Sequence, residues 1–216
     1  MIEAVVFDLD GVLLDSEQVW DEAREHLAAE RGGHWHAQAQ RDMMGMSSTE
    51  WARYMHETIG LPEPPDEINR EVVERLTAIY REHLPAIPGA REAVERVAAR
   101  WPLGLASSSN RELIDLVLEL LGVDHLFAAT VSSEEVARGK PAPDVYLEAA
   151  RRLGVDPLRA AAVEDSHNGI LSAKAAGMRV LAIPNVHFPP DEEALAEADA
   201  VLDSLEGLTA EAVEPR

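Results

Sequence analysis

Two carboxylates, one residue apart, follow an apolar stretch near the start of the chain. Residues 4–7 predict a buried strand, Asp8 and Asp10 come directly after it, and Gly11 allows the backbone to turn away. Because side chains alternate along a strand, both carboxylates project the same way from its C-terminal end. Carboxylates at that edge are costly unless they hold a cation or do chemistry. In open α/β sheets, ligands bind at the same edge.

Polar side chains also follow three later predicted strands. Ser107 and Ser108 end a strand at 103–107, Lys140 comes after a strand near 128–132, and Glu164 with Asp165 follows a strand at 160–163. Taken singly, each has a plain alternative, such as a helix cap, a solvated loop charge or an acidic helix start. Because these strands are predicted to be parallel, all of these groups would meet at one edge of the sheet. Their recurrence at successive strand ends favours one shared cleft.

Phosphoryl transfer is the chemistry that this set of residues suits. Asp8, Asp165 and a backbone carbonyl supply the hard oxygen ligands that Mg²⁺ prefers. A carboxylate nucleophile splits one difficult step into two through an aspartyl-phosphate, and the metal neutralises the repulsion between two anions. Ser107, the N–H groups beside it and Lys140 can hold phosphate oxygens. Asp10 can protonate the leaving oxygen and then accept a proton from water.

The remaining pattern predicts where these residues are positioned. Strands and helices alternate from residue 87 onward, which is typical of an α/β fold with a Rossmann-like, doubly wound parallel sheet. The helical block 15–86 interrupts this alternation after the first strand, so we expect an inserted α-helical cap domain there and a catalytic core made of residues 1–14 and 87–216. Within the block we expect helices at 17–31, with Ser16 as N-cap, at 48–58, and after Asp66 as cap. Residues 34–46 carry no clear pattern.

Composition narrows the classes of function. The chain has 216 residues, a net charge of −21 and no cysteine. The acidic charge argues against nucleic acid and anionic membrane surfaces as partners, and the lack of cysteine excludes disulfides and thiolate chemistry. No apolar run approaches the roughly 20 residues of a membrane span, and the N-terminus shows no secretory signal. We therefore expect a cytoplasmic enzyme, a monomer or weak homodimer, whose partner is a small phosphorylated substrate.

Four segments together resemble the motifs of the haloacid dehalogenase superfamily. They are residues 8–15 (DLDGVLLD), 106–109 (ASSS), 139–144 (GKPAPD) and 163–166 (VEDS), in the same order and at suitable spacing. The helical block looks like the α-helical cap of that superfamily, and the chain is most similar to the β-phosphoglucomutase-like phosphatases. The resemblance implies that Asp8 is the nucleophile and Asp10 the acid and base. It places Asp8, Asp10 (through its carbonyl), Glu164 and Asp165 around Mg²⁺. It places Ser107, Ser108 and Lys140 at the phosphate.

Individual residues discriminate among the chemistries of the superfamily. Dehalogenases lack the second aspartate, so Asp10 argues against that activity. Phosphonate hydrolases need a lysine in the cap, and no lysine precedes Lys140. A mutase needs cationic contacts at both ends of a bisphosphate, whereas this chain has Trp20 in place of the mutase histidine and Ser48 in place of the arginine. We favour a phosphatase acting on a small metabolite such as a sugar phosphate. The alternatives are a phosphosugar mutase and a non-catalytic regulatory protein.

The cap is expected to supply the residues that select the substrate. Candidates to line it are Glu17, Trp20, Met44, Met46 and Trp51. The competing interpretation has the tryptophans packing between cap helices; it is favoured for Trp51 and stands level for Trp20. Hinges are expected near residues 14–16 and 86–89. Further polar residues are interpreted as solvent-facing: His34, His36, Arg41, Arg53 and, at the mouth of the cleft, His167.

Overall fold

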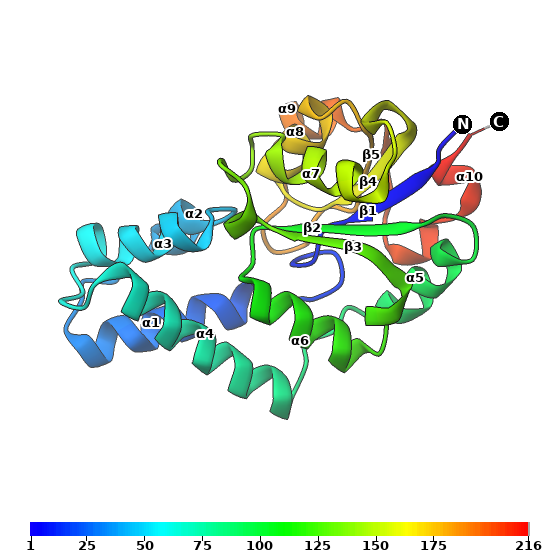
Figure 1. Ribbon diagram of the computed structural model, residues 1–216. Helices are drawn as coiled ribbons and strands as arrows, with labels where there is room; N and C mark the ends of the chain where they lie inside the picture. Colours follow the sequence, from blue (N-terminus) through cyan, green and yellow to red (C-terminus); the bar gives the residue numbers. More distant parts are fainter. Residues whose placement is uncertain (216) are drawn as a thin grey trace.

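A six-stranded, entirely parallel sheet forms the centre of the protein (Figure 1). The computed structural model describes residues 1–215. The spatial order of the strands is β3-β2-β1-β4-β5-β6, so the chain winds to one side of β1 and then returns to the other. The predicted doubly wound α/β fold is confirmed. The strands are β1 (Ala4–Phe7), β2 (Leu103–Ser107), β3 (Phe127–Ser132), β4 (Ala160–Glu164), β5 (Arg179–Ala182) and β6 (Ala200–Val201).

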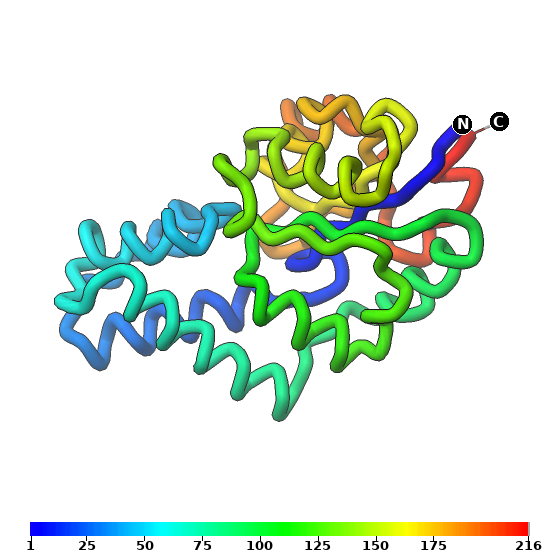
Figure 2. Tube along the Cα trace, in the orientation of Figure 1, coloured from blue at the N-terminus to red at the C-terminus, as the bar shows by residue number. Residues whose placement is uncertain are grey.

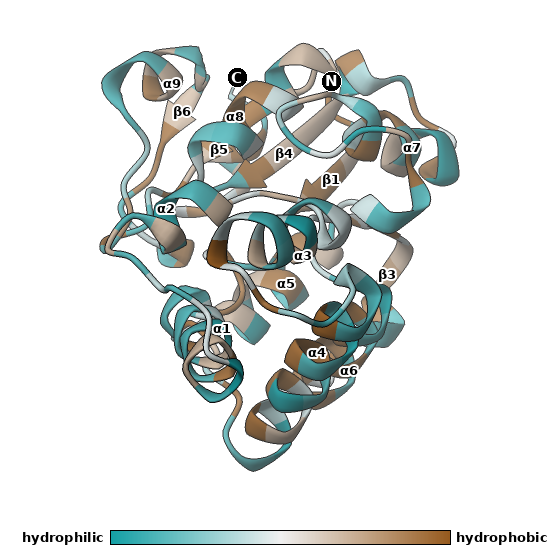
Figure 3. Ribbon diagram, turned by 90° about the vertical axis from the view of Figure 1, so that its left-hand side faces the viewer, coloured by the Kyte–Doolittle hydropathy of each residue, from teal (hydrophilic) through white to brown (hydrophobic). Residues whose placement is uncertain are grey.

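Helices cover both faces of the sheet, and every residue of β1, β2 and β4 is buried as a result. Val6 of β1 packs in a cluster with α7 and α8, whereas Val5 and Phe7 point to the opposite cluster with α5 and α6. The central strands are accordingly among the most apolar parts in Figure 3. The helices of these layers are α5 (Ala90–Ala98), α6 (Arg111–Leu121), α7 (Asp144–Leu153), α8 (His167–Ala175), α9 (Glu192–Glu197) and α10 (Ala210–Val213).

The remaining helices form a separate group beyond the C-terminal ends of the strands, at the left of Figure 1. They are α1 (Glu17–Arg31), α2 (Ala39–Met43), α3 (Ser48–Tyr54), a π-helical turn (Met55–Ile59) and α4 (Pro65–Glu82). The two chain segments that connect this group to the sheet run side by side. Leu14 and Ala86 form an antiparallel bridge, and the amide of Asp15 donates to the carbonyl of Pro85 (2.8 Å).

Helix α1 has the predicted bounds, but two expected caps differ from the structure. Ser16 makes no side-chain cap, since its hydroxyl donates to Asp10 instead. Asp66 is not the cap of α4: the helix begins at Pro65, whose fixed φ suits a first helical position, and Asp66 lies in the first turn. The helix expected at 48–58 divides into α3 and the π-helical turn. Residues 39–43, which have no clear periodicity, form the short helix α2.

The two ends of the described chain lie together, far from α1–α4 (Figure 2). The amide of Ile2 donates to the carboxylate of Glu214 at 2.9 Å. Across residues 1–215, the helices are all too short or too polar to cross a bilayer. Short 3₁₀ turns complete the structure at Asp124–Leu126, Ser133–Glu135, Pro157–Arg159 and Leu205–Gly207.

Candidate active site

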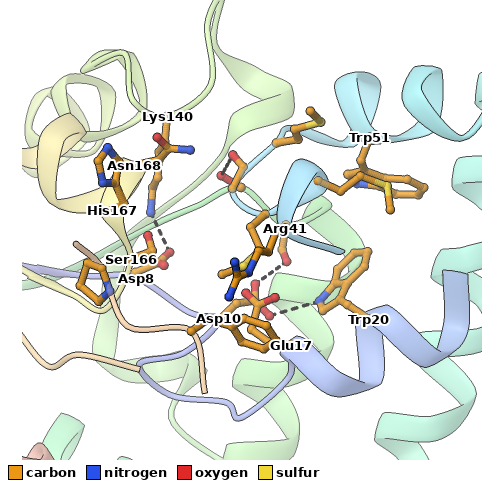
Figure 4. A pocket seen from close by; sticks show the side chains of 18 of the residues that line it. Asp8, Asp10, Glu17, Trp20, Arg41, Trp51, Lys140, Ser166, His167 and Asn168 are labelled. Atoms are coloured by element: carbon orange, nitrogen blue, oxygen red, sulfur yellow. Dashed lines mark hydrogen bonds and ion pairs between the residues drawn. The ribbon is translucent and has the colours of Figure 1, made fainter. Parts of the chain in front are cut away.

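The structure brings four of the predicted site residues into direct contact or close proximity at the strand ends. Two of them, Asp8 and Lys140, are labelled in Figure 4. The ammonium group of Lys140 lies 2.9 Å from Asp8 Oδ1 and 2.5 Å from Glu164 Oε1. Asp8 follows β1, Glu164 ends β4, Asp165 follows it, and Lys140 comes from the loop after β3. All four are buried. Lys140 is therefore not the solvated loop charge that its sequence position alone would allow.

Both carboxylate oxygens of Glu164 accept hydrogen bonds, so this residue does more than cap the start of a helix. Its Oε1 also accepts from the hydroxyl of Tyr146 (2.7 Å), and its Oε2 accepts from the amide of Asp165 (3.0 Å) and from Ser166. A Cβ added to Gly169 would lie about 2 Å from this carboxyl group, so only glycine leaves room for it. Tyr146 was not identified from the sequence, because a tyrosine on the apolar face of a helix carries no distinguishing signal.

Asp8, Glu164 and Asp165 form a cluster of three carboxylates with one neighbouring cation. One carboxylate oxygen from each lies within 4.8 Å of the others, and Lys140 is the cation beside them. Burial raises the pKa of Asp8 to about 8, with Lys140 opposing and Glu164 adding to the effect. Burial, then Glu164 and Asp8, raise the pKa of Asp165 well above its usual range.

The donor set fits a divalent cation with a preference for hard oxygen ligands. Within residues 1–215, Asp165 Oδ1 is buried and has no hydrogen-bond partner. A Cβ at Gly11 would lie 1.8 Å from the other oxygen of Asp165, so the glycine, with φ of 80°, keeps that carboxylate free. Adding a divalent ion to buried carboxylates would lower the cost of keeping them ionised.

Asp10 faces away from this cluster, towards the start of α1 (Figure 4). Its Oδ1 accepts from Ser16 Oγ (2.5 Å) and from the indole N–H of Trp20 (3.4 Å), and its Oδ2 accepts from Ser109 Oγ (2.6 Å). Neutral hydroxyl and indole donors thus hold the carboxylate in place. Asp10 therefore stands between the sheet edge and the helices α1–α4.

The serines that follow β2 also lie in this region. Ser107 is buried, and its Oγ accepts from the amide of Ser109 (3.0 Å). Ser108 Oγ donates to the carbonyl of Gly45 in the loop after α2, at 3.3 Å. The sheet edge and the helical group are therefore linked directly beside the carboxylates.

A cavity of about 590 Å³ lies between the sheet edge and the helical group. Asp8, Asp10, Ser107, Ser108 and Lys140 line one side. All five predicted cap residues line the other: Glu17, Trp20, Met44, Met46 and Trp51.

The two tryptophans combine both interpretations that their positions allowed. Trp51 is only 2% exposed and packs edge-on against Trp20, with ring centroids 5.9 Å apart, yet both rings contribute to the wall of the cavity. The packing and lining roles are therefore both present in each tryptophan.

Several lining residues were not expected from the sequence. Arg24 is buried between Trp20 and Trp51, and Arg41, expected as a surface charge, is exposed but borders the cavity. The spacing of Arg24 from Trp20, one helical turn, would have placed both on one face. The lining also includes His167, Asn168 and the segment 187–191. His167 lies 3.1 Å from the carboxylate of Asp191.

Comparisons with known proteins agree with this arrangement. The family model of haloacid dehalogenase-like hydrolases matches residues 2–177, so the chain belongs to that family. Hexitol phosphatase B of Escherichia coli (strain K12) is 36% identical over 215 residues, which cover 97% of this chain and 95% of that protein.

Two solved structures resemble the whole fold. CbbY from Rhodobacter sphaeroides, in complex with phosphate, matches with a TM-score of 0.87 and 29% identity, over 99% of this chain and 100% of that one. β-Phosphoglucomutase from Clostridium difficile matches with a TM-score of 0.83 and 26% identity, over 98% and 95% of the two chains.

Proposed function

We propose that this protein is a Mg²⁺-dependent phosphomonoester hydrolase that acts on a small phosphorylated carbohydrate through an aspartyl-phosphate. The observation that carries the proposal is the buried contact of Lys140 with Asp8 and Glu164, beside the unpaired oxygen of Asp165. Buried carboxylates at the C-terminal edge of a parallel sheet need a function that offsets their cost. Relatives named as hexitol phosphatase B and phosphorylated carbohydrates phosphatase support the substrate class.

In the proposed reaction, an oxygen of Asp8 attacks the phosphorus atom while Ser107, with Ser108 beside it, and Lys140 hold the other phosphate oxygens. The bond from phosphorus to the substrate oxygen breaks, and Asp10 gives its proton to that oxygen. Asp10 then accepts a proton from water as the water attacks the aspartyl-phosphate, which releases inorganic phosphate and restores Asp8. The hydrogen bonds from Ser16, Trp20 and Ser109 hold Asp10 at the side from which a substrate oxygen would leave.

Asp8, Asp165 and the carbonyl of Asp10 would hold the metal. When bound, Mg²⁺ would neutralise charge on the phosphate and the nucleophile. Glu164 would support the metal by positioning its neighbours, since both of its oxygens already accept hydrogen bonds.

Residues 15–86 would act as a cap on a core made of residues 1–14 and 87–216. The paired connections at Leu14 and Ala86 support hinges there, because two adjacent strands of chain can bend together. Closure over the substrate would exclude water, and opening would release the products.

A phosphosugar mutase is the second candidate, because Arg24 and Arg41 border the cavity on the helical side. Against it stand Trp20 and Ser48: the first binds Asp10, and the second donates to Glu134 (2.9 Å) rather than facing a phosphate. The sequence also has no lysine between residues 15 and 86. β-Glucose 1-phosphate distinguishes the two candidates, since a mutase would form glucose 6-phosphate with little free phosphate.

The deciding experiment measures phosphate release from sugar phosphates, sugar-alcohol phosphates and nucleotides, with Mg²⁺ and with EDTA. We expect Mg²⁺-dependent release from the carbohydrate group, abolished in Asp8→Asn. Asp115→Asn, a matched change at an exposed aspartate on α6, should leave it intact. Full turnover in Asp8→Asn would overturn the mechanism. No release from any compound by the wild-type protein would favour the non-catalytic alternative.

A further inference from the structure

One face of helix α1 presents three polar or aromatic side chains to the cavity. Glu17, Trp20 and Arg24 follow the spacing i, i+3 and i+7, which places them on the same side of a helix. Glu17 and Trp20 lie across the cavity from Asp8 and Lys140 (Figure 4), and Arg24 lines the same cavity. A substrate whose phosphate contacts the strand ends would therefore extend its other end towards this face.

Arg24 is held in a position that few arginines occupy. Its guanidinium carbon lies 4.6 Å from the ring centroid of Trp20 and 4.8 Å from that of Trp51, and the residue is only 6% exposed. Two indoles that also pack against each other thus fix the guanidinium by cation–π contacts. The side chain is positioned before any ligand binds, so little conformational entropy would be lost on binding.

The donors of this guanidinium lack protein partners. Within residues 1–215, the Arg24 side chain makes neither a hydrogen bond nor an ion pair within 4 Å, and its Nε is shielded from solvent. Burial lowers the pKa of Arg24 to about 10, with Glu17 opposing, so the group stays charged at neutral pH. A guanidinium has five N–H donors, and those on Nη1 and Nη2, which are not shielded as Nε is, remain available to an acceptor in the cavity.

Glu17 supplies an acceptor on the same face of α1, in the lining of the same cavity. Its Oε2 accepts from Gln40 Nε2 (3.0 Å), and the same amide donates to the carbonyl of Glu17 (3.1 Å), so Gln40 fixes both the side chain and the backbone. Burial, then Asp10, raises the pKa of Glu17 to about 7. The face therefore offers a fixed donor group and a fixed acceptor group two helical turns apart.

We propose that Arg24 and Glu17 form a hydroxyl-recognition pair that selects polyhydroxylated monophosphates, an inference that rests on the phosphatase function proposed above. The hydroxyl groups of one polyol chain can donate to Glu17 and accept from Arg24, which no apolar chain can do. A second phosphate is disfavoured because it would face Glu17 and Asp10 as well as Arg24. The cavity of about 590 Å³ is of the size that holds a small metabolite.

The test compares hexitol 6-phosphate with n-hexyl phosphate, which has the same chain length and no hydroxyl groups. We expect Arg24→Met to reduce the wild-type preference for the hexitol compound, as the ratio of kcat/KM values, by about 10- to 100-fold. Most of the loss should appear in KM. Glu17→Gln should reduce the same ratio about 10-fold. Because this change preserves the volume of the side chain, it also tests the proposal if Arg24→Met fails to fold.

Arg53→Met is the matched control, since Arg53 is exposed on α3 and lies away from the cavity lining. Equal losses on both substrates would mean that Arg24 has a structural role only and would overturn the proposal. So would a wild-type enzyme that hydrolyses hexyl phosphate as well as hexitol phosphate. A larger loss on a hexose bisphosphate than on the hexitol monophosphate would assign Arg24 to a second anion instead. Absence of phosphate release from every compound would instead contradict the phosphatase function itself.

Discussion

The two walls of the cavity are built by different physical means. At the sheet edge, Asp8 and Glu164 both contact Lys140, at 2.9 and 2.5 Å, and Glu164 also accepts from Tyr146 and from the amide of Asp165. On the helical wall, Arg24 is held by the faces of two indoles and leaves its donors unpaired.

In the proposed function, this difference separates the residues that carry out the reaction from those that recognise the substrate. Charged groups that contact one another at the ends of rigid strands keep one geometry, whatever the substrate carries beyond its phosphate. Groups fixed by stacking, with hydrogen-bonding capacity left over, depend on the ligand to complete them. Changes at the sheet edge should therefore affect every substrate and the stability of the fold, whereas changes on the helical wall should alter the choice among substrates.

Replacing the buried cation should give the largest effect. Lys140→Met leaves Asp8 and Glu164 buried without their counter-charge, which typically costs about 3–5 kcal/mol. We expect that loss in urea denaturation of the metal-free protein, together with loss of turnover on all substrates. Lys174→Met, at a half-exposed lysine 3.5 Å from Asp199, is the control. Wild-type stability in Lys140→Met would contradict the distinction between the walls.

A smaller loss is expected from Gly169→Ala. The new Cβ would lie about 2 Å from the Glu164 carboxyl group, and overpacking of this kind costs about 3 kcal/mol at the upper end of its usual range. Gly207→Ala should be nearly neutral, because its Cβ would meet only Leu202 at 3.6 Å. The comparison measures the melting temperature of both variants and their kcat on one good substrate. If Gly169→Ala changed neither quantity, the Glu164 carboxylate would have room to move.

The stability of the metal-free protein should depend on pH, because three buried carboxylates at the sheet edge face one cation, Lys140. The pKa of Asp8 is about 8 in the folded chain against 3.8 for the ordinary group, so the folded state binds the proton more tightly. The stabilisation from proton binding at Asp8 is fully present below about pH 4 and is lost as the pH rises towards about 8. In EDTA, the free energy of unfolding should fall by up to about 1.4 kcal/mol per pH unit from this group.

Denaturant titrations at several pH values between about 5 and about 8 would measure the slope. Asp8→Asn should make the slope less steep, because Asp165 and Glu17, whose pKa values are also raised, still contribute. Glu148→Gln, at an ion pair on α7 where the pKa of the carboxyl is lowered to about 2, should not change it in this range. If the free energy of unfolding of the wild-type protein instead increased with pH, the carboxylate cluster would be more stable in its ionised form even without metal.

The smallest effect is expected at a contact that joins the two walls. Ser48 Oγ and Asn110 Nδ2 both donate to Glu134 Oε1, at 2.9 and 2.8 Å, so Glu134 ties α3 to the start of α6. Ser48→Ala removes one such hydrogen bond, which contributes about 1 kcal/mol. We expect KM to change by a few fold in either direction with kcat nearly constant. Ser47→Ala, whose hydroxyl bonds only Glu50 of its own helix, is the control. A large fall in kcat would give Ser48 a part in the chemistry.

Much of the fold and of the sheet-edge site could be predicted from the sequence. The strand ends at Asp8, Ser107 and Glu164 were predictable because, in an α/β chain, a short apolar run that stops abruptly at a polar residue is typical of a buried strand. The bounds of α1 and the helical interruption between residues 15 and 86 were equally clear. What the sequence left open was the orientation of side chains: the bonds of Asp10 with Ser16, Trp20 and Ser109 depend on three separate segments meeting.

The sequence by itself determined which groups stand at the ends of the strands, because hydrophobic period and parallel topology together allow one edge for all of them. Only the tertiary structure decided how those groups are paired and what faces them. Arg24 resembles any other helical arginine until Trp20 and Trp51 enclose it, and Tyr146 resembles a core residue until its hydroxyl meets Glu164. The physical reason is that burial and partner geometry depend on residues distant in the chain, which local patterns do not contain.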